Sequence, residues 1–193
     1  VRVLNASASL APVNDMIALW PNDQNPTHLI VCNEEGTAQP GVQRVRMDGL
    51  VETILTGTTS CDPVRRTPWG TIIVGEETAD GHLIEILNPL ATTNVSYDRV
   101  TGLASGGTGS GNVVSRDAVG RLAFEGIALY PNGVMYYGDE NRPSNGNPGG
   151  AYFKFVPTTL WSGGGAITNL NDSPLAGGKV YGLKLGRRSG NTD

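Results

Sequence analysis

Glycine and proline are the feature that most constrains how this chain can fold. The sequence holds 27 glycines and 12 prolines among 193 residues, about a fifth of the chain, where roughly 12% is usual. Such frequent breaks exclude a helical bundle or a coiled coil, because both need long uninterrupted helices. Turn signals recur roughly every 8–12 residues, and no window keeps a helical period of apolar residues. We therefore expect an all-β protein: a sandwich, a barrel or a propeller.

Composition narrows the class of protein. Hydrophobic residues make up 38% of the chain and charged residues 17%, which argues against disorder. The net charge of −4 gives no support to a nucleic-acid partner. The apolar runs are far shorter than the ~20 residues that span a bilayer, so we expect no membrane span. No signal peptide is visible and the sequence opens on Val1, so we interpret residues 1–193 as one domain of a processed or partial chain.

Ten segments have the length and apolar pattern of strands. The expected strands are Met16–Trp20, His28–Cys32, Val42–Met47, Val51–Leu55, Gly70–Val74, Leu83–Leu87, Ile127–Tyr130, Val134–Tyr137, Ala151–Val156 and Val180–Leu185. Pro131-Asn132-Gly133 is a good hairpin turn between two of them. Two glycine-rich stretches, Thr101–Asn112 and Arg142–Gly150, are expected to be loops.

A weak internal repeat joins three of these strands to acidic residues. The segments HLIVCNEEG, TIIVGEET and VMYYGDEN each run from an apolar strand into two adjacent carboxylates. The acidic pairs are Glu34-Glu35, Glu76-Glu77 and Asp139-Glu140. The first two pairs are 42 residues apart, which is close to the length of one propeller blade. If the strands are equivalent in successive blades, all three pairs lie on the same face of the molecule.

Carboxylates gathered in this way imply cations. Several acids near one axis repel strongly unless positive ions lie between them. Oxygen ligands without a histidine cluster favour calcium, or iron if a thiolate joins them. Glu125, at the entry to another strand, is a further candidate. The alternative is that these acids are solvated loop residues.

The segment SCDPVRRTPWG could add a soft metal ligand and two positively charged side chains. Cys61 is followed by Arg65 and Arg66, so this segment could supply a thiolate to a metal and guanidinium groups to a phosphate. The alternative is a surface loop with a buried cysteine. From the residues alone, Cys32 and Cys61 form one disulfide, remain two buried thiols, or include a metal ligand.

Five motifs in order carry a resemblance to a known family. TPWGTIIVGEE, GHLIEILNP, GRLAFEG, GVMYYGDE and GAYFKFVP resemble the PhoX-type alkaline phosphatases and related uncharacterised exported propeller proteins, over Met16 to Leu185. The resemblance implies an exported, periplasmic or extracellular β-propeller with antiparallel blades. It also implies that iron and calcium bind at one face and that the protein hydrolyses phosphate monoesters.

The resemblance assigns site residues position by position. It makes Cys61 a free thiolate ligand, rather than half of a bridge to Cys32, which is then a buried thiol. The implied metal ligands are Cys61, Glu35, Glu76, Glu77, Glu125, Asp139 and Glu140. Glu34 and Phe124 stand where the family motifs carry histidines. These two departures, and the CDPVRR loop, bear on hydrolysis more than on metal binding.

Two functions are expected on this basis. The first is metal-dependent phosphomonoester hydrolysis, in which Arg65 or Arg66 holds a phosphate oxygen of the ester substrate. The second is a non-catalytic, calcium-stabilised extracellular propeller that acts as a binding or assembly module. At about 45 residues per blade the chain makes roughly four blades, fewer than the family's propeller. We therefore expect the N-terminal part of a longer chain, with its remainder or a partner chain covering the open strand edges.

Overall fold

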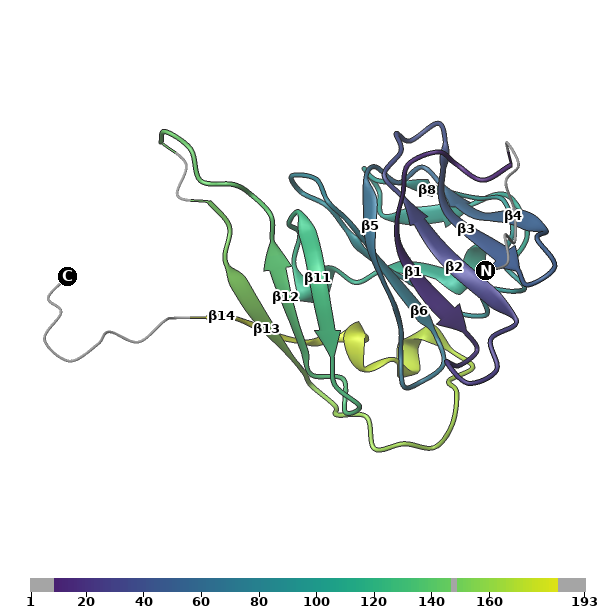
Figure 1. Ribbon diagram of the computed structural model, residues 1–193. Helices are drawn as coiled ribbons and strands as arrows, with labels where there is room; N and C mark the ends of the chain where they lie inside the picture. Colours follow the sequence, from purple (N-terminus) through teal and green to yellow (C-terminus); the bar gives the residue numbers. More distant parts are fainter. Residues whose placement is uncertain (1–8, 147–148, 184–193) are drawn as a thin grey trace, which may run out of the picture.

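The fold is built entirely from short strands and 3-10 turns. The computed structural model describes residues 9–146 and 149–183 (Figure 1). The strands are β1 (Asn14–Trp20), β2 (His28–Asn33), β3 (Pro40–Arg46), β4 (Val51–Thr56), β5 (Cys61–Arg66), β6 (Ile72–Glu76), β7 (Leu83–Ile86), β8 (Val95–Asp98), β9 (Leu103–Ser105), β10 (Val113–Ser115), β11 (Phe124–Leu129), β12 (Met135–Asp139), β13 (Tyr152–Pro157) and β14 (Gly178–Gly182). The 3-10 turns are η1 (Ser110–Asn112), η2 (Asp117–Val119), η3 (Leu170–Asp172) and η4 (Pro174–Ala176). The expected all-β class is confirmed.

Three sheets repeat one up-and-down order. The first runs β1-β2-β3-β4 and is extended by β8 and β9, the second runs β5-β6-β7-β10, and the third runs β11-β12-β13-β14. Neighbouring strands are antiparallel, except that β8 pairs parallel to β4. No sheet closes on itself within the described residues. Three successive four-stranded units agree with expected blades, but a propeller is not established.

The second sheet lies between the other two, as Figure 1 shows around β5 and β6. Side chains alternate along β6, so Ile72 and Val74 pack into the core shared with the first sheet, while Ile73 joins the core shared with the third. Every residue of β6 and β7 is buried, as expected of strands that are covered on both faces. Among the described residues, the third sheet is covered on one face only.

Most of the expected strands are present, with small shifts at their ends. β5, β8, β9 and β10 were not expected, because these strands are short or interrupted by polar residues, proline and glycine. The loop prediction for Thr101–Asn112 is wrong in part, since β9 lies inside it. Arg142–Gly150 contains no named strand among its described residues; residues 147–148 lie outside them. Residues 184–185 of the last expected strand also lie outside the described residues.

A disulfide joins the first and second sheets. Cys32 of β2 and Cys61 of β5 are bonded, with their Cα atoms 5.1 Å apart, and both are fully buried. The prediction that Cys61 is a free thiolate ligand is therefore wrong, as is the prediction that Cys32 is a thiol. The physical reason is the stacking of β2 on β5, which faces the two side chains across the core. A sulfur in a disulfide is not a thiolate ligand.

The described part of the chain has no helix with the length and apolar character to cross a bilayer.

Candidate metal centre

The first strand of each sheet is irregular near its start. In each case three residue steps along this strand match two along its partner, which is the signature of a β-bulge. The irregular steps lie at Asn14–Ile17, Cys61–Val64 and Phe124–Ile127. An acidic residue stands at the same place in all three: Asp15, Asp62 and Glu125. A bulge breaks the alternation of side chains, so it can turn an acid out of its regular direction.

The second strand of each sheet ends beside this bulge. Asn33, Glu76 and Asp139 are paired with the residues that open the three bulges. The residues that follow them are Glu34, Glu77 and Glu140. The repeat recognised in the sequence is thus real, but its first segment is shifted by one residue: Glu34, not Glu35, is equivalent to Glu77 and Glu140.

Two of the expected ligands, Glu76 and Asp139, instead accept hydrogen bonds that hold the neighbouring loops in place. Glu76 is buried and accepts hydrogen bonds from the backbone amides of Thr59 (2.8 Å) and His82 (2.9 Å) and from Nε of Arg99 (2.8 Å). Asp139 Oδ1 accepts from the backbone amides of Ala123 and Asn141, at 3.2 and 3.1 Å. The structure does not bring Glu76 or Asp139 into the group that can share an ion.

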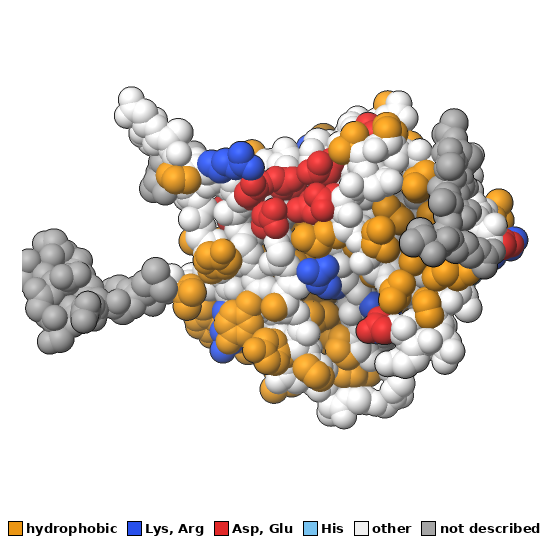
Figure 2. Space-filling view, viewed as in Figure 1, with side chains coloured by type: hydrophobic (Ala, Val, Ile, Leu, Met, Phe, Trp, Pro, Cys, Tyr) orange, Lys and Arg blue, Asp and Glu red, His pale blue; other side chains and the backbone are white. Residues whose placement is uncertain are grey.

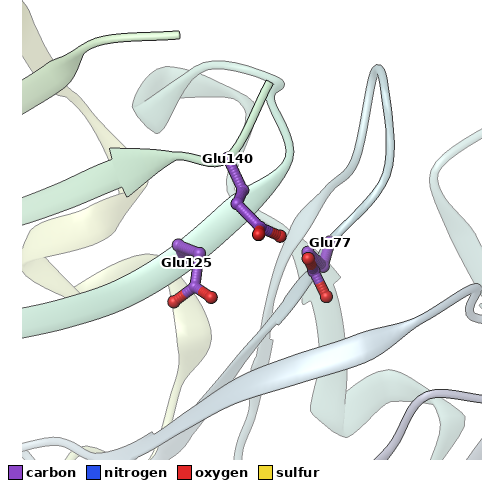
Figure 3. A group of neighbouring side chains, drawn as sticks. All are labelled: Glu77, Glu125 and Glu140. Carbon is purple, nitrogen blue, oxygen red and sulfur yellow. The ribbon is translucent and has the colours of Figure 1, made fainter. Parts of the chain in front are cut away.

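Three of the expected ligands do come together. Glu77, Glu125 and Glu140 each offer one carboxylate oxygen, and these oxygens lie within 4.8 Å of one another. Figure 3 shows the three side chains converging from different strands. All three are half-buried. They belong to the second and third sheets, so the group lies at the junction between those sheets.

Asp62 connects the same group to the first sheet. It is buried, and its pKa is raised to about 7 by burial first, then by a hydrogen bond with Asp15 and by the charges of Asp15, Glu125 and Glu34. We call the six carboxylates drawn from the three sheets the acidic cluster: Asp15, Glu34, Asp62, Glu77, Glu125 and Glu140. Figure 2 shows acidic side chains gathered on one face of the molecule, where the sheets meet.

Two buried carboxylate oxygens in this region have no hydrogen-bond donor. They are Oδ1 of Asp62 and Oε1 of Glu35. The Glu35 backbone carbonyl accepts from the Ser60 amide at 3.0 Å, and the Ser60 carbonyl accepts from the Glu77 amide at 2.7 Å, so Glu35 lies one loop away from the cluster. Buried polar atoms are nearly always paired. A cation bound at the cluster would give an orphaned oxygen its partner.

The arginines named from the sequence lie elsewhere. Nε of Arg65 donates to the Ile127 carbonyl at 2.9 Å, which ties β5 to β11. Nη1 of Arg66 donates to Asp23 at 2.8 Å and to the Leu19 carbonyl at 2.6 Å. Both stand at the far end of β5 from Asp62, so their positions give no support to a phosphate clamp. The described arginine paired with the cluster is Arg142, which contacts Glu140.

Sequence reasoning did not select Asp15 or Asp62, and it treated Glu34 only as a departure from a motif. A signal for the bulge acids is present in the tetrapeptides NDMI, CDPV and FEGI, where an acid precedes an aliphatic residue by two positions. Each tetrapeptide lies in the strand before one that is directly followed by a glutamate: Glu34, Glu77 or Glu140. The pattern becomes visible only when the three sheets are superposed in register.

Comparison with known proteins adds no family. No protein-family model matches the chain, and no curated protein matches it significantly. The chemistry of the acidic cluster is therefore the basis for a functional assignment.

Proposed function

We propose that this chain is a calcium-binding module whose acidic cluster holds Ca²⁺. The observation that carries the proposal is Asp62, a buried carboxyl with an unpartnered oxygen among like charges. Glu77, Glu125 and Glu140 offer carboxylate oxygens within 4.8 Å of one another, and carboxylates that bind through one or both oxygens are the ligands Ca²⁺ takes in its adaptable geometry. An ion bound there would neutralise the repulsion and lock the three sheets together.

The donor set favours calcium over iron. The expectation of iron depended on a Cys61 thiolate, and that sulfur is in a disulfide. The acidic cluster consists of carboxylates alone, and hard oxygen donors suit Ca²⁺ better than softer transition metals. Glu77, Glu125 and Glu140 would supply the direct ligands, with Asp62 behind them.

Phosphomonoester hydrolysis is the second candidate, and one observation favours it. A pocket of about 360 Å³ adjoins the cluster and is lined by Glu125, Asp139, Glu140, Gly150 and Tyr152, among others. A phosphate ester in this pocket would lie beside any cations held by the cluster, and such cations would offset the charge of a phosphoryl group. The chain's own residues would position the ester and exclude water around it.

Export is part of the same proposal. The Cys32–Cys61 disulfide supports an oxidising compartment such as the periplasm or the cell exterior, because disulfides rarely persist in the cytosol. Calcium at extracellular concentrations is also high enough to fill sites of modest affinity.

Calorimetric titration with CaCl₂ tests calcium binding directly. We expect binding to the parent chain, and at least a tenfold weaker Kd for Glu77→Gln, Glu125→Gln and Glu140→Gln. Glu52→Gln is the matched control, because Glu52 lies on β4, where it pairs with Arg44 at 3.0 Å. Calcium should also raise the Tm of the parent, since a ligand at 100 times its Kd adds about 2.7 kcal/mol. No heat of binding and no Tm change would reject the proposal.

An aryl phosphate assay separates the two candidates. Turnover that needs calcium or iron and is lost in Glu125→Gln would establish hydrolysis. Calcium binding without turnover under any metal would leave the non-catalytic module.

A further inference from the structure

The sequence contains two Asn-Gly pairs, Asn132-Gly133 and Asn145-Gly146. In such a pair the backbone nitrogen of the glycine can attack the Cγ atom of the asparagine side chain, because glycine has no Cβ to hinder the approach. The attack needs a backbone that is free to rotate and a glycine amide that is not held in a hydrogen bond. The contacts of each pair in the fold therefore decide whether that pair reacts.

The first pair is held firmly in the turn between β11 and β12. The Gly133 amide donates to the Tyr130 carbonyl at 2.9 Å, and the Asn132 carbonyl accepts from the Trp161 amide at 2.9 Å. The side-chain oxygen of Asn132 accepts from the Val134 amide at 3.2 Å. Gly133 is also buried. The attacking nitrogen and the asparagine side chain are thus both engaged, so this pair is protected.

The second pair lies in the connection between β12 and β13, which Figure 1 shows projecting away from the sheets. Asn145 and Gly146 are both exposed. Apart from its chain neighbours, no atom lies within 4 Å of the position that a Cβ on Gly146 would take. Among the described residues, neither Asn145 nor Gly146 takes part in a hydrogen bond. The nitrogen of Gly146 is therefore open to react with the Asn145 side chain.

The base of this loop is fixed although its tip is open. The Gly150 amide donates to the Asn141 carbonyl at 2.5 Å, and the Asp139 amide donates to the Ala151 carbonyl at 3.1 Å. Gly150 also packs so closely on Asp139 that a Cβ at this position would collide with the Asp139 backbone. These contacts separate the loop tip from Glu140, so a chemical change at the tip should leave the acidic cluster in place.

We propose that Asn145 is a site of spontaneous deamidation and isomerisation in the folded protein, and that Asn132 is protected. The deprotonated nitrogen of Gly146 forms a bond to Cγ of Asn145, and the side-chain amide leaves as ammonia. Water then opens the five-membered succinimide ring at one of its two carbonyls. One product is aspartate, and the other is isoaspartate, in which the backbone runs through the former side chain. Both products add one negative charge at an exposed loop tip, where changes are tolerated.

Peptide mapping by mass spectrometry, after incubation of the full chain at pH 8, measures both sites in one sample. We expect Asn145 to deamidate at least tenfold faster than Asn132 in the folded chain. In guanidinium chloride the two rates should approach each other, because unfolding removes the hydrogen bonds that protect Asn132. This comparison separates the effect of the fold from that of the Asn-Gly sequence.

Methylation by an isoaspartyl methyltransferase detects the isomerised product independently. The incubated parent should accept methyl groups, and Asn145→Gln should not, because the corresponding six-membered ring forms far more slowly. Asn132→Gln is the matched control and should be methylated like the parent. Circular dichroism checks that both variants are folded.

Two outcomes would overturn the proposal. One is a folded chain in which Asn132 reacts as fast as Asn145, and the other is an Asn145 that reacts only in denaturant. Neither outcome bears on calcium binding, which is measured separately.

Discussion

At the scale of residues, Asp62 shows most clearly that the negative charges of the acidic cluster are not fully balanced by positive ones. It is surrounded by carboxylates, and burial contributes most to the rise of its pKa from 3.8 to about 7. The folded chain therefore holds a proton on Asp62 that the unfolded chain has already released at pH 5 or 6. Stability falls as the pH rises through this window, because the folded state binds more protons than the unfolded state. A bound cation would reverse this by favouring the ionised carboxylate.

The variant Asp62→Asn should separate the effect of the Asp62 charge on protein stability from its effect on calcium binding. In EDTA at pH 8 the variant should be more stable than the parent, by at most about 4 kcal/mol, since one pKa unit corresponds to about 1.4 kcal/mol. At pH 4 the two chains should unfold alike, because Asp62 is then neutral in the fold. Thermal unfolding at both pH values measures this. Asp172→Asn, at an exposed position on η3, is the control and should match the parent at both pH values.

Adding calcium in the same thermal-unfolding experiment should change the stability of the parent relative to that of Asp62→Asn. With calcium at pH 8 the parent should gain more stability than Asp62→Asn, since the bound ion would be attracted by the charge of the Asp62 carboxylate, which the amide lacks. A variant that is less stable than the parent in EDTA at pH 8 would contradict the charge argument.

At the scale of elements, the bulges in β1, β5 and β11 set where acids point. β11 carries Glu125 and Gly126 between Phe124 and Ile127, which are the residues paired with β12 on either side of the irregular step. Gly138 of β12 lies beside Glu125, close enough that a Cβ at Gly138 would be in ordinary van der Waals contact with the Cβ of Glu125. Because side chains alternate with a period of two, one residue more or less in such a strand turns the later side chains to the opposite face.

Deleting Gly126 should therefore abolish the site while leaving the sheet. The shortened β11 can pair regularly with β12, and Glu125 then loses the direction that brings it to Glu77 and Glu140. We expect at least tenfold weaker calcium binding, measured by titration, with strand content by circular dichroism unchanged. Deleting Gly164, which lies in an exposed loop with open space around it, should leave calcium binding unchanged.

The same bulges explain how far the sequence could predict the site. Alternating apolar residues located ten strands, and acidic pairs after three of them predicted a shared face. Glu77 and Glu140, from two of these pairs, do lie together with Glu125. Which of the two adjacent acids faces the cluster depends on the register of the strand pairing. Glu76 and Glu77 are adjacent, yet one holds a loop and the other joins the cluster. A single sequence does not reveal a bulge, so Asp15 and Asp62 could not be assigned.

At the scale of the whole molecule, the disulfide fastens the first sheet to the second. Cys32 and Cys61 are 29 residues apart in sequence, and a cross-link closing a loop of this size contributes about 3–4 kcal/mol in the chain-entropy account. The sequence pattern alone did not decide whether the two cysteines are bonded to each other, because the stacking of β2 on β5 is what brings them together.

Replacing both cysteines by alanine should lower the free energy of unfolding by about 3 kcal/mol without removing calcium binding. Denaturant unfolding and calcium titration, done in parallel, measure the two effects. Loss of calcium binding from an otherwise folded double variant would contradict the expectation that the disulfide and the acidic cluster act separately. The reduced parent should behave like the double variant, which controls for the alanine side chains.

The division of the acidic cluster among three sheets also sets the order of events during synthesis. Each sheet contributes one acid from its bulge and one from the end of its second strand, and two of the three proposed direct ligands, Glu125 and Glu140, come from the third sheet. Because β11 and β12 follow the first two sheets in the sequence, the growing polypeptide makes those two sheets before the proposed site is complete. If the acidic cluster holds calcium as proposed, ion capture would follow the docking of the third sheet on the second, and it would act as a checkpoint for that docking.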